Sequence, residues 1–226
     1  MTDAERWLER VHVRPAATPP ALEPLVRGLA DVVPGQLSRN DEPATVVAER
    51  QAAVLILIAT DDPAGPDVLL QQRASTMRTH AGEVAYPGGS REAEDRGPVE
   101  TAVREAVEET GLDPAGVDPL ATLPRLHIPP SRFDVTAVLA HWRAPSPVHA
   151  ADPRETVRVM RVPLRVLADP DARVLARGPG GWTGPAFRIP GAVVWGFTGE
   201  VLDALLRLGG WARPWDDGAA VDLASL

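Results

Sequence analysis

A helix that carries both of its own boundary signals is the feature that most constrains this chain. Pro98 suits the first turn of a helix and Gly111 suits the residue that ends one, so the sequence predicts a helix from about Val99 to Thr110. At about 100° per residue, residues three and four apart become neighbours, which separates an apolar arc from an acidic arc. The apolar arc carries Val99, Ala102, Val103, Ala106 and Thr110, and the acidic arc carries Glu105, Glu108 and Glu109. The first arc can pack on a core while the second faces a cleft.

The acidic arc predicts a divalent-metal site. Three carboxylates this close repel one another unless something neutralises them, and hard oxygen ligands on a rigid element suit Mg²⁺ or Mn²⁺, which also bind substrate phosphates. The alternative is a solvated acidic helix face, because surface helices commonly carry such charges. The segments around the helix favour the metal site.

Several motifs precede the helix at short intervals. They are Leu69-Leu70-Gln71-Gln72-Arg73, then Arg78-Thr79-His80-Ala81-Gly82, then Tyr86-Pro87-Gly88-Gly89, and finally Arg104 through Leu112. Together they resemble the Nudix hydrolase superfamily, and the aromatic-Pro-Gly-Gly turn resembles its coenzyme A pyrophosphatase branch. Weaker likenesses follow at Glu155, at Val162-Pro163-Leu164 and at Trp195-Gly196-Phe197-Thr198. The resemblance spans about Ala52 to Leu208 and leaves the first fifty residues uncovered.

One position departs from the general pattern of the superfamily. Asp95 stands where the pattern has a glutamate, and one extra residue separates it from the Arg104-Glu105 pair. This longer spacing resembles that of the coenzyme A branch, which often has aspartate at that place. We therefore assign no metal to Asp95.

The resemblance implies a set of site residues and an α/β/α sandwich with a mixed sheet. Glu105, Glu108 and Glu109 would be metal ligands, with Glu105 and Glu109 the strongest candidates because they lie one helical turn apart, and with the carbonyl of Gly88 as a further ligand. Arg104 would orient the glutamates by charge-assisted hydrogen bonds, the alternative being an exposed helix arginine. Glu105 leads as the general base, and Glu155 follows unless it is only a charge at the rim of the site.

The resemblance also implies how a substrate is held. Arg73 and Arg78 precede the glycine turn and could grip phosphates, including the ribose 3′-phosphate of coenzyme A, since arginine binds phosphate bidentately. Ordinary surface arginines are the alternative. Trp195 is expected to pack or to bracket a turn, and stacking on adenine is the alternative.

The first functional hypothesis is Mg²⁺- or Mn²⁺-dependent hydrolysis of coenzyme A or acyl-CoA to 3′,5′-ADP and (acyl-)4′-phosphopantetheine. A second is hydrolysis of another nucleoside diphosphate derivative, such as ADP-ribose, a dinucleotide or an oxidised nucleotide, because loops select the substituent. A third, of a different class, is a noncatalytic nucleotide-sensing module, against which the intact carboxylates argue.

The composition argues against several other classes of function. The formal charge of −8 disfavours nucleic-acid binding, which needs a basic footprint. The absence of cysteine excludes disulfides, zinc thiolates and thiol nucleophiles, and makes a reducing cytoplasm the expected compartment. The charged start and the short apolar run from Ala52 to Ala59 predict neither a signal peptide nor a membrane span. Dimers are common among such relatives, so a homodimer stays open.

The expected organisation is one domain with extensions. We expect an N-terminal helical extension at 1–48, the hydrolase domain at 49–212 and a C-terminal tail at 213–226. Short helices are predicted at Ala4 to Val11 and Pro20 to Val33, and a final helix near Val201 to Leu208. Strands are predicted at Ala52–Ala59, Val68–Gln72, Leu120–Leu126, Phe133–Trp142 and Thr156–Pro163. A loop or loose hairpin is expected between Leu167 and Ile189, where glycine and proline accumulate.

Overall fold

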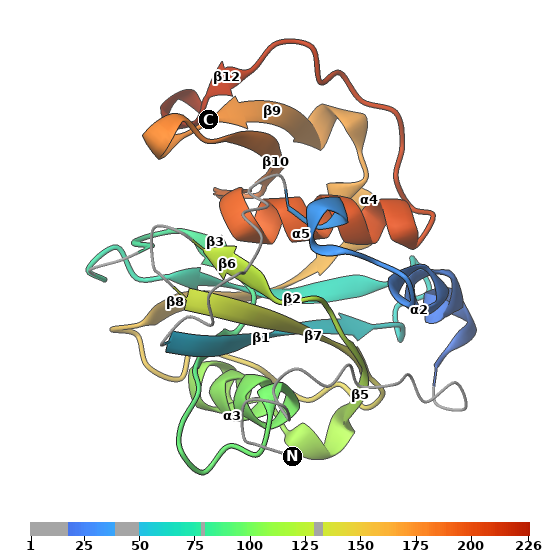
Figure 1. Ribbon diagram of the computed structural model, residues 1–226, viewed down its shortest axis with the longest axis vertical. Helices are drawn as coiled ribbons and strands as arrows, with labels where there is room; N and C mark the ends of the chain where they lie inside the picture. Colours follow the sequence, from blue (N-terminus) through green and yellow to red (C-terminus); the bar gives the residue numbers. More distant parts are fainter. Residues whose placement is uncertain (1–17, 39–49, 78–79, 129–132) are drawn as a thin grey trace.

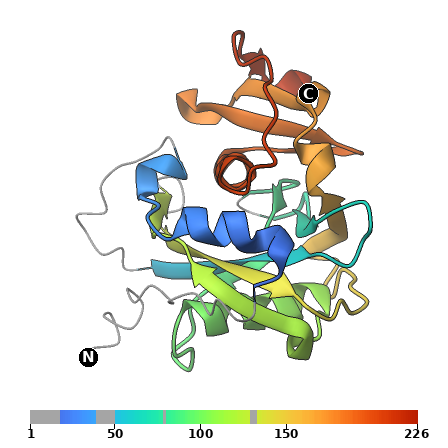
Figure 2. The same cartoon turned by 90° about the vertical axis from the view of Figure 1, so that its right-hand side faces the viewer.

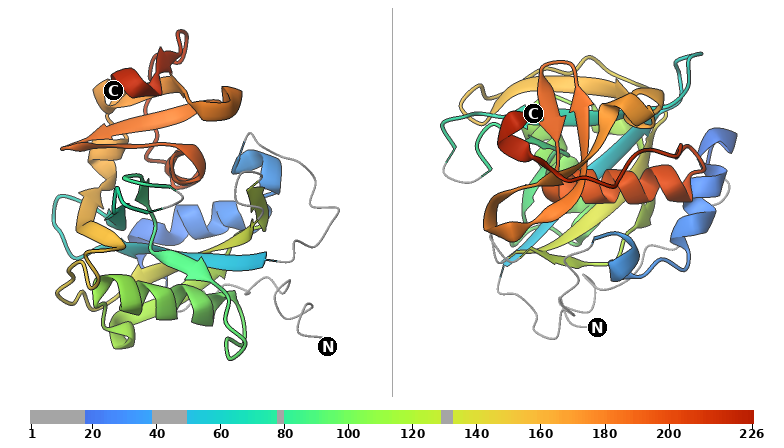
Figure 3. Two further views of the ribbon diagram at one scale, coloured as in Figure 1. Left: turned by 90° about the vertical axis from the view of Figure 1, so that its left-hand side faces the viewer. Right: turned by 90° about the horizontal axis from the view of Figure 1, so that it is seen from above.

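The architecture is an α/β/α sandwich around a mixed β-sheet, which confirms the predicted fold class. The computed structural model describes residues 18–38, 50–77, 80–128 and 133–226. Helix α3 (Pro98–Thr110) covers one face of the sheet, and α2 (Glu23–Leu29) and α5 (Gly196–Leu208) cover the other (Figure 1). A second, smaller sheet lies beyond α5, so this helix is enclosed between two sheets, as Figure 2 and the left view of Figure 3 show.

The main sheet is built around β1 (Arg50–Ala59). Its other strands are β2 (Asp67–Arg73), β3 (Val84–Ala85), β4 (Gly88–Ser90), β5 (Val117–Thr122), β6 (Leu126–Ile128), β7 (Phe133–Trp142) and β8 (Thr156–Pro163). The main path runs β3-β2-β1-β7-β5, while β4 pairs with β1, β6 with β7 and β8 with β2. β1 and β7 are parallel and all the other pairs are antiparallel. The sheet is therefore mixed, as predicted.

Alternation along β1 divides the core into two clusters. Ala53, Leu55 and Leu57 point toward α3, whereas Ile56 and Ile58 point toward α2 and α5. All five are buried, and side chains of a strand alternate between the two faces of a sheet. An apolar run covered on both faces is typical of a central strand in a layered α/β protein.

Helix α3 has the bounds that its sequence predicts. Pro98 occupies its first turn, and Gly111 follows Thr110 in the left-handed conformation at φ 66°. Glycine adopts this conformation without steric cost, which makes it a good helix stop. Ala102 and Ala106 on the inner face are fully buried against the sheet.

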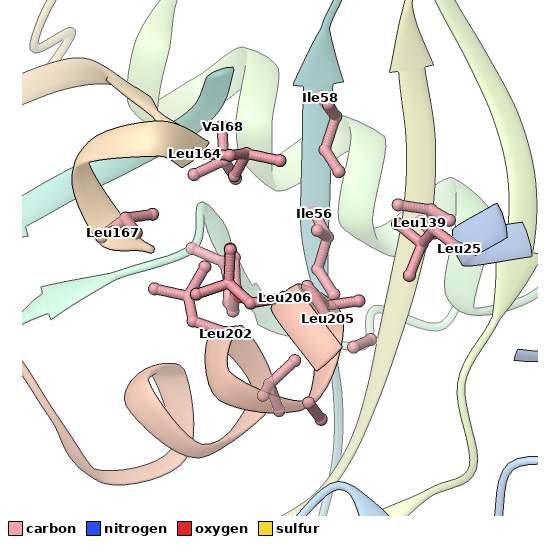
Figure 4. Close-up of a cluster of buried hydrophobic side chains, with 14 of the residues drawn as sticks. Leu25, Ile56, Ile58, Val68, Leu139, Leu164, Leu167, Leu202, Leu205 and Leu206 are labelled. Atoms are coloured by element: carbon pink, nitrogen blue, oxygen red, sulfur yellow. The ribbon is translucent and has the colours of Figure 1, made fainter. Parts of the chain in front are cut away.

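The opposite face of the sheet carries the larger core cluster. Leu202, Leu205 and Leu206 of α5 meet Ile56 and Ile58 of β1, and the same cluster extends to Leu25 of α2 and Leu139 of β7 (Figure 4). The predicted helix from Val201 to Leu208 is thus confirmed, and it begins earlier, at Gly196.

The segment between Leu167 and Ile189, for which a loop or a loose hairpin is expected, contributes two strands to the smaller sheet. The strands of this sheet are β9 (Arg173–Arg177), β10 (Thr183–Ile189), β11 (Ala192–Val194) and β12 (Val221–Asp222), in the order β11-β10-β9-β12. β9 and β10 form an antiparallel hairpin closed by the Gly-Pro-Gly-Gly segment, so the hairpin is confirmed and the loop is wrong. The loop expectation failed because two strands flank the glycine and proline residues that suggested it.

Short elements complete the chain. They are α4 (Leu164–Leu167) and the 3₁₀ turns η2 (Pro20–Leu22), η3 (Pro34–Gln36), η4 (Pro114–Gly116), η5 (Pro170–Ala172), η6 (Pro179–Gly181) and η7 (Leu223–Ser225). The predicted strand from Leu120 to Leu126 is wrong in its continuity, since β5 ends at Thr122 and β6 starts at Leu126.

The expected N-terminal helices are tested only in part, and the expected domain boundaries are not tested. The predicted helix from Ala4 to Val11 lies outside the described residues, while Pro20 to Val33 contains η2 and the shorter α2. The boundaries at 48/49 and 212/213 stay predictions, although β12 comes from the expected tail and pairs with β9. Among the residues that the structure describes, no helix combines the length and apolar character needed to cross a membrane.

Candidate active site

Two glycines let a strand and a helix approach closely enough to form a site. β4 pairs with the first half of β1, and α3 lies against it. A Cβ on Gly88 would lie 2.4 Å from the carbonyl oxygen of Ala53, and one on Gly89 would lie 2.5 Å from Oε2 of Glu105. Any side chain at Gly89 would therefore occupy the place of the Glu105 carboxylate.

Glu109 is the most deeply buried carboxylate of the acidic arc, with 8% of its surface exposed. Its Oε2 accepts hydrogen bonds from Nε2 of Gln71 at 2.6 Å and from the backbone amide of Gly88 at 2.8 Å. Burial raises the pKa of Glu109 to about 7, despite the opposing effects of these two donors and of Arg73. The protein thus holds an acid that is costly to ionise in the absence of a cation.

Glu105 lies one helical turn before Glu109 and faces the same glycines. Its side chain is 17% exposed. Burial raises its pKa, and the nearby Arg104 opposes that rise. Glu105 and Glu109 are close enough that the charge of Glu105 also raises the pKa of Glu109.

Glu108 has a different environment from its two neighbours. Its side chain is 56% exposed and both of its oxygens accept hydrogen bonds from Nη1 of Arg104, at 3.2 and 3.4 Å. The three predicted ligands are therefore not equivalent: Glu105 and Glu109 lie toward the glycines, and Glu108 lies outward beside Arg104.

Arg104 connects the helix to the loop before it. Besides Glu108, its Nη1 contacts Oε1 of Glu105 at 3.2 Å, and its Nη2 donates to the carbonyl of Ser90 at 2.9 Å. The opposite edge of the guanidinium binds both oxygens of Asp95. This bidentate pair was not anticipated from the sequence, although the extra residue before Arg104 marked Asp95 as unusual.

Burial alone would raise the pKa of Asp95, which is only 5% exposed. Hydrogen bonds from Arg104, from the backbone amide of Glu92 and from the hydroxyl of Thr101 outweigh that effect and lower the pKa to about 2. Asp95 is therefore ionised under ordinary conditions and is saturated by protein donors. The expectation that Asp95 takes no metal stays a prediction.

Arg73 and Glu155 come from the neighbouring strands. Nη1 of Arg73 lies 3.8 Å from Oε1 of Glu109, and its Nε is buried with no hydrogen-bond partner among the described residues. Glu155 is exposed in the turn just before β8, and its carbonyl accepts a hydrogen bond from the amide of Ala74 at 2.7 Å. Arg78 lies outside the described residues.

Two polar residues beside the acidic arc were missed by the sequence analysis. Gln71 is completely buried and Thr156 is 1% exposed, and the two are hydrogen-bonded to each other. A glutamine inside the apolar strand segment around Leu69 and Leu70 is the signal that could have revealed the first. No local pattern marks Thr156.

The donor set around Gly88 and Gly89 fits a small divalent cation. Glu105 and Glu109 are withdrawn from water, and such carboxylates are costly unless a positive charge compensates them. Mg²⁺ is typically held by one or two carboxylates while waters and substrate phosphates fill its remaining positions. Among the described residues, however, no three acidic or histidine side chains are grouped so that they could hold a metal ion, so the structure does not bring Glu105, Glu108 and Glu109 together as a three-carboxylate cluster.

Comparisons with known proteins add to this geometry. A model of the NUDIX domain matches residues 49–177. An uncharacterized Nudix hydrolase, NudL, of Cronobacter sakazakii is 36% identical over 129 residues, which cover 57% of this chain and 65% of that protein. The NudL of Pectobacterium atrosepticum is 40% identical over 116 residues, which cover 51% and 58%. The match thus spans less than two thirds of the length of these relatives.

A solved structure supports the fold. The Nudix hydrolase RenU of M. smegmatis aligns with a TM-score of 0.51 and 22% sequence identity, covering 74% of this chain and 89% of that one. This structural likeness covers more of the chain than residues 49–177, which the NUDIX domain matches. The sandwich described above also extends beyond residue 177.

Proposed function

This chain belongs to the Nudix domain family, and we propose that it is a divalent-metal-dependent hydrolase of a nucleoside diphosphate derivative. One observation carries the proposal. Glu105 and Glu109 are drawn out of water beside a glycine pair that has no room for a side chain. Burying two carboxylates side by side carries a desolvation and repulsion cost that a bound divalent cation would offset.

The metal ligands in this proposal are Glu105, Glu109 and the carbonyl of Gly88, with Glu108 reaching the metal through water or through a rotation away from Arg104. Bound Mg²⁺ or Mn²⁺ would neutralise the diphosphate and lower the pKa of a coordinated water. Arg104 holds Glu105 by a hydrogen bond and is itself fixed by Asp95 and the Ser90 carbonyl. Its role is to keep the carboxylates in place.

Proton removal from the attacking water is assigned to Glu105, with Glu155 as the second candidate. Glu105 faces the glycine pair and carries a raised pKa because of burial, which suits a base that works near neutrality. Glu155 is exposed and would have to approach the site from the turn just before β8.

For the substrate we propose coenzyme A or acyl-CoA, cut to 3′,5′-ADP and (acyl-)4′-phosphopantetheine. Support comes from the aromatic-Pro-Gly-Gly turn, the length of the segment between Gly89 and Arg104, and the position of Arg73. The guanidinium of Arg73 lies 3.8 Å from Glu109 and the Arg73 side chain is 21% exposed, so it can contact a phosphate bound at the carboxylates. Arg78 is proposed as a further phosphate contact.

The proposal is tested by mass spectrometry of the products from coenzyme A, acyl-CoA, ADP-ribose and nucleoside triphosphates, each with Mg²⁺, with Mn²⁺ and with a chelator. We expect metal-dependent formation of 3′,5′-ADP from the coenzyme A substrates. Glu109→Gln should abolish it, while Glu100→Gln should not, because Glu100 lies on the same helix but pairs with Arg96 at the surface.

Each other outcome has a definite meaning. Efficient cleavage of ADP-ribose or a nucleoside triphosphate with no cleavage of coenzyme A would overturn the substrate proposal and leave the reaction class intact. Binding of coenzyme A without turnover of any diphosphate would support the noncatalytic sensor instead.

A further inference from the structure

The two oxygens of the Glu109 carboxylate are treated differently by the protein. Oε2 accepts two hydrogen bonds, from Nε2 of Gln71 at 2.6 Å and from the amide of Gly88 at 2.8 Å. Oε1 accepts no hydrogen bond from the described residues, and the guanidinium of Arg73 lies 3.8 Å from it, beyond hydrogen-bond distance. One oxygen is thus tied to the frame of the protein and the other is left for a ligand.

Gln71 is itself held in place by Thr156, on the side away from Glu109. Its Oε1 accepts a hydrogen bond from the hydroxyl of Thr156 at 2.8 Å, and both side chains are almost completely buried. A glutamine amide has an accepting end and a donating end. With its oxygen occupied by Thr156, the donating end faces Glu109.

A β-bulge brings Thr156 to this position. β2 and β8 pair in regular register from Asp67 to Gln72, and Gln72 lies opposite Arg158, but the next residue, Arg73, lies opposite Thr156. Val157 is therefore the additional residue of the bulge, and 53% of its surface is exposed.

The bulge changes which side chain reaches the carboxylate. Side chains alternate along a strand, so regular pairing would have placed Val157 opposite Arg73, on the side of the sheet where Gln71 lies. The extra residue turns Val157 outward and presents the hydroxyl of Thr156 instead. Bulges commonly reorient a side chain next to a functional site in this way.

We propose that Gln71 and Thr156 are positioning residues for the metal site: they fix Oε2 of Glu109 so that Oε1 stays directed at a divalent cation. This inference rests on the proposed function, in which Glu109 is a metal ligand. Neither residue touches the cation or the substrate. They order the Glu109 carboxylate in the metal-free protein, so that cation binding does not have to restrict its rotation.

We expect a measurable effect on metal affinity because the contacts from Thr156 through Gln71 to Glu109 are all buried. A buried amide that loses its partner cannot find water in its place, so it either moves or leaves its polar atom unsatisfied. Movement of Gln71 transmits to Oε2 of Glu109. Groups that orient metal ligands from behind typically change metal affinity by about 10- to 100-fold when they are removed.

The test is Mn²⁺ binding, followed by the electron paramagnetic resonance signal of free Mn²⁺, in purified full-length protein without substrate. We expect Thr156→Val to weaken Mn²⁺ binding by about 3- to 10-fold and Gln71→Met by about 10- to 100-fold, while Thr156→Ser, which keeps the hydroxyl, binds like the original protein. Thr198→Val, a buried threonine on α5 beyond the main sheet, is the matched control and should leave binding unchanged.

Thermal unfolding of each variant shows whether it is folded, and kinetics separate positioning from general damage. At saturating Mn²⁺ the KM for a diphosphate substrate should stay close to that of the original protein, because the substrate contacts are intact. If folded Thr156→Val and Gln71→Met both bind Mn²⁺ like the original protein, the positioning role is refuted. Failure of the original protein to bind Mn²⁺, or full binding by Glu109→Gln, would instead refute the proposed function on which this inference rests.

Discussion

Both oxygens of Asp95 bind one edge of the Arg104 guanidinium, at 3.1 Å from Nε and 3.0 Å from Nη2. This leaves Nη1 free to serve the acidic arc, where it contacts Glu105 and Glu108. The pair joins the loop before α3 to the middle of that helix. Bidentate arginine–carboxylate contacts are among the strongest charge-assisted hydrogen bonds in proteins, and they restrict orientation as well as distance.

Asp95→Asn is expected to destabilise the protein and to change its response to acid. The pKa of Asp95 is lowered from 3.8 to about 2 in the folded protein, so its ionised form stabilises the fold by about 2 kcal/mol above pH 4. Because the folded-state pKa lies below the unfolded one, this contribution is lost as the pH falls from about 4 toward 2. Urea unfolding measured between pH 7 and pH 2 would show the loss in the original protein and its absence in the variant.

Asp152→Asn is the matched control for that prediction. Asp152 also binds an arginine through both oxygens, but its partner Arg154 is 89% exposed. Exposed ion pairs contribute little to stability because solvent screens them. An equal loss of stability in both variants would contradict the view that the Asp95–Arg104 pair has a special structural role.

Gly89→Ala should abolish activity while leaving the fold intact. The new Cβ would lie 2.5 Å from Oε2 of Glu105, which is the far end of a flexible side chain and can swing aside. The backbone therefore tolerates the change, but the Glu105 carboxylate loses its place. We expect turnover to fall by at least about 100-fold, the order seen when a preorganised charged group leaves a catalytic site. Gly97→Ala, at the start of the same helix with nothing within 4 Å of its Cβ, is the control.

Features of the site that depend on neighbours in sequence were predictable. The bounds of α3 follow from Pro98 and Gly111, and the burial of β1 follows from its apolar composition. The sequence also placed Glu105 and Glu109 one turn apart. For that reason it favoured these two over Glu108 as metal ligands, although helical spacing alone does not say which side of the acidic arc faces the glycine turn and which faces Arg104.

Features that depend on contacts distant in sequence were not predictable. Thr156 reaches Gln71 across 85 positions, and it does so only because of a bulge that no local pattern announces. The smaller sheet was missed for a related reason. Its strand β12 comes from the segment expected to be a tail, and pairs with β9 far upstream. Strand pairing of this kind is decided by tertiary packing rather than by local propensity.

Glu109→Gln is expected to stabilise the metal-free protein at high pH. The folded-state pKa of Glu109 is raised from 4.5 to about 7, so ionising this carboxyl in the fold costs up to about 3 kcal/mol as the pH rises through 7. Glutamine carries no charge and its oxygen can still accept from Gln71 and Gly88. The melting temperature in a chelator should therefore rise relative to the original protein at pH 8 and change little at pH 5, where Glu109 is already protonated.

Mn²⁺ should reverse that order of stability. A cation that binds the folded protein stabilises it by mass action, and Glu109→Gln would remove the proposed metal ligand. We therefore expect millimolar Mn²⁺ to raise the melting temperature of the original protein at pH 8 and to have little effect on the variant. A variant that melts below the original protein in chelator at pH 8 would show that the buried carboxylate is not a stability cost.

Arg73→Ala is expected to weaken substrate binding more than it slows the chemical step. The Arg73 guanidinium lies on the Oε1 side of Glu109, and its buried Nε has no hydrogen-bond partner among the described residues, so it is placed to bind a phosphate. Charge-assisted hydrogen bonds are worth about 1.5–3 kcal/mol, which corresponds to a rise in KM of about 10- to 100-fold. Arg73→Lys should recover only part of this loss, since a single ammonium cannot bind phosphate bidentately.

Steady-state kinetics at saturating metal would check this, with Arg177→Ala as the control because Arg177 is an exposed arginine on the smaller sheet. Removing a contact that is equally strong in the ground state and the transition state raises KM and leaves kcat unchanged. A fall in kcat with an unchanged KM would mean that Arg73 acts on the charge that develops during bond cleavage. In that case its proximity to Glu109 would reflect a role in the reaction and not in substrate capture.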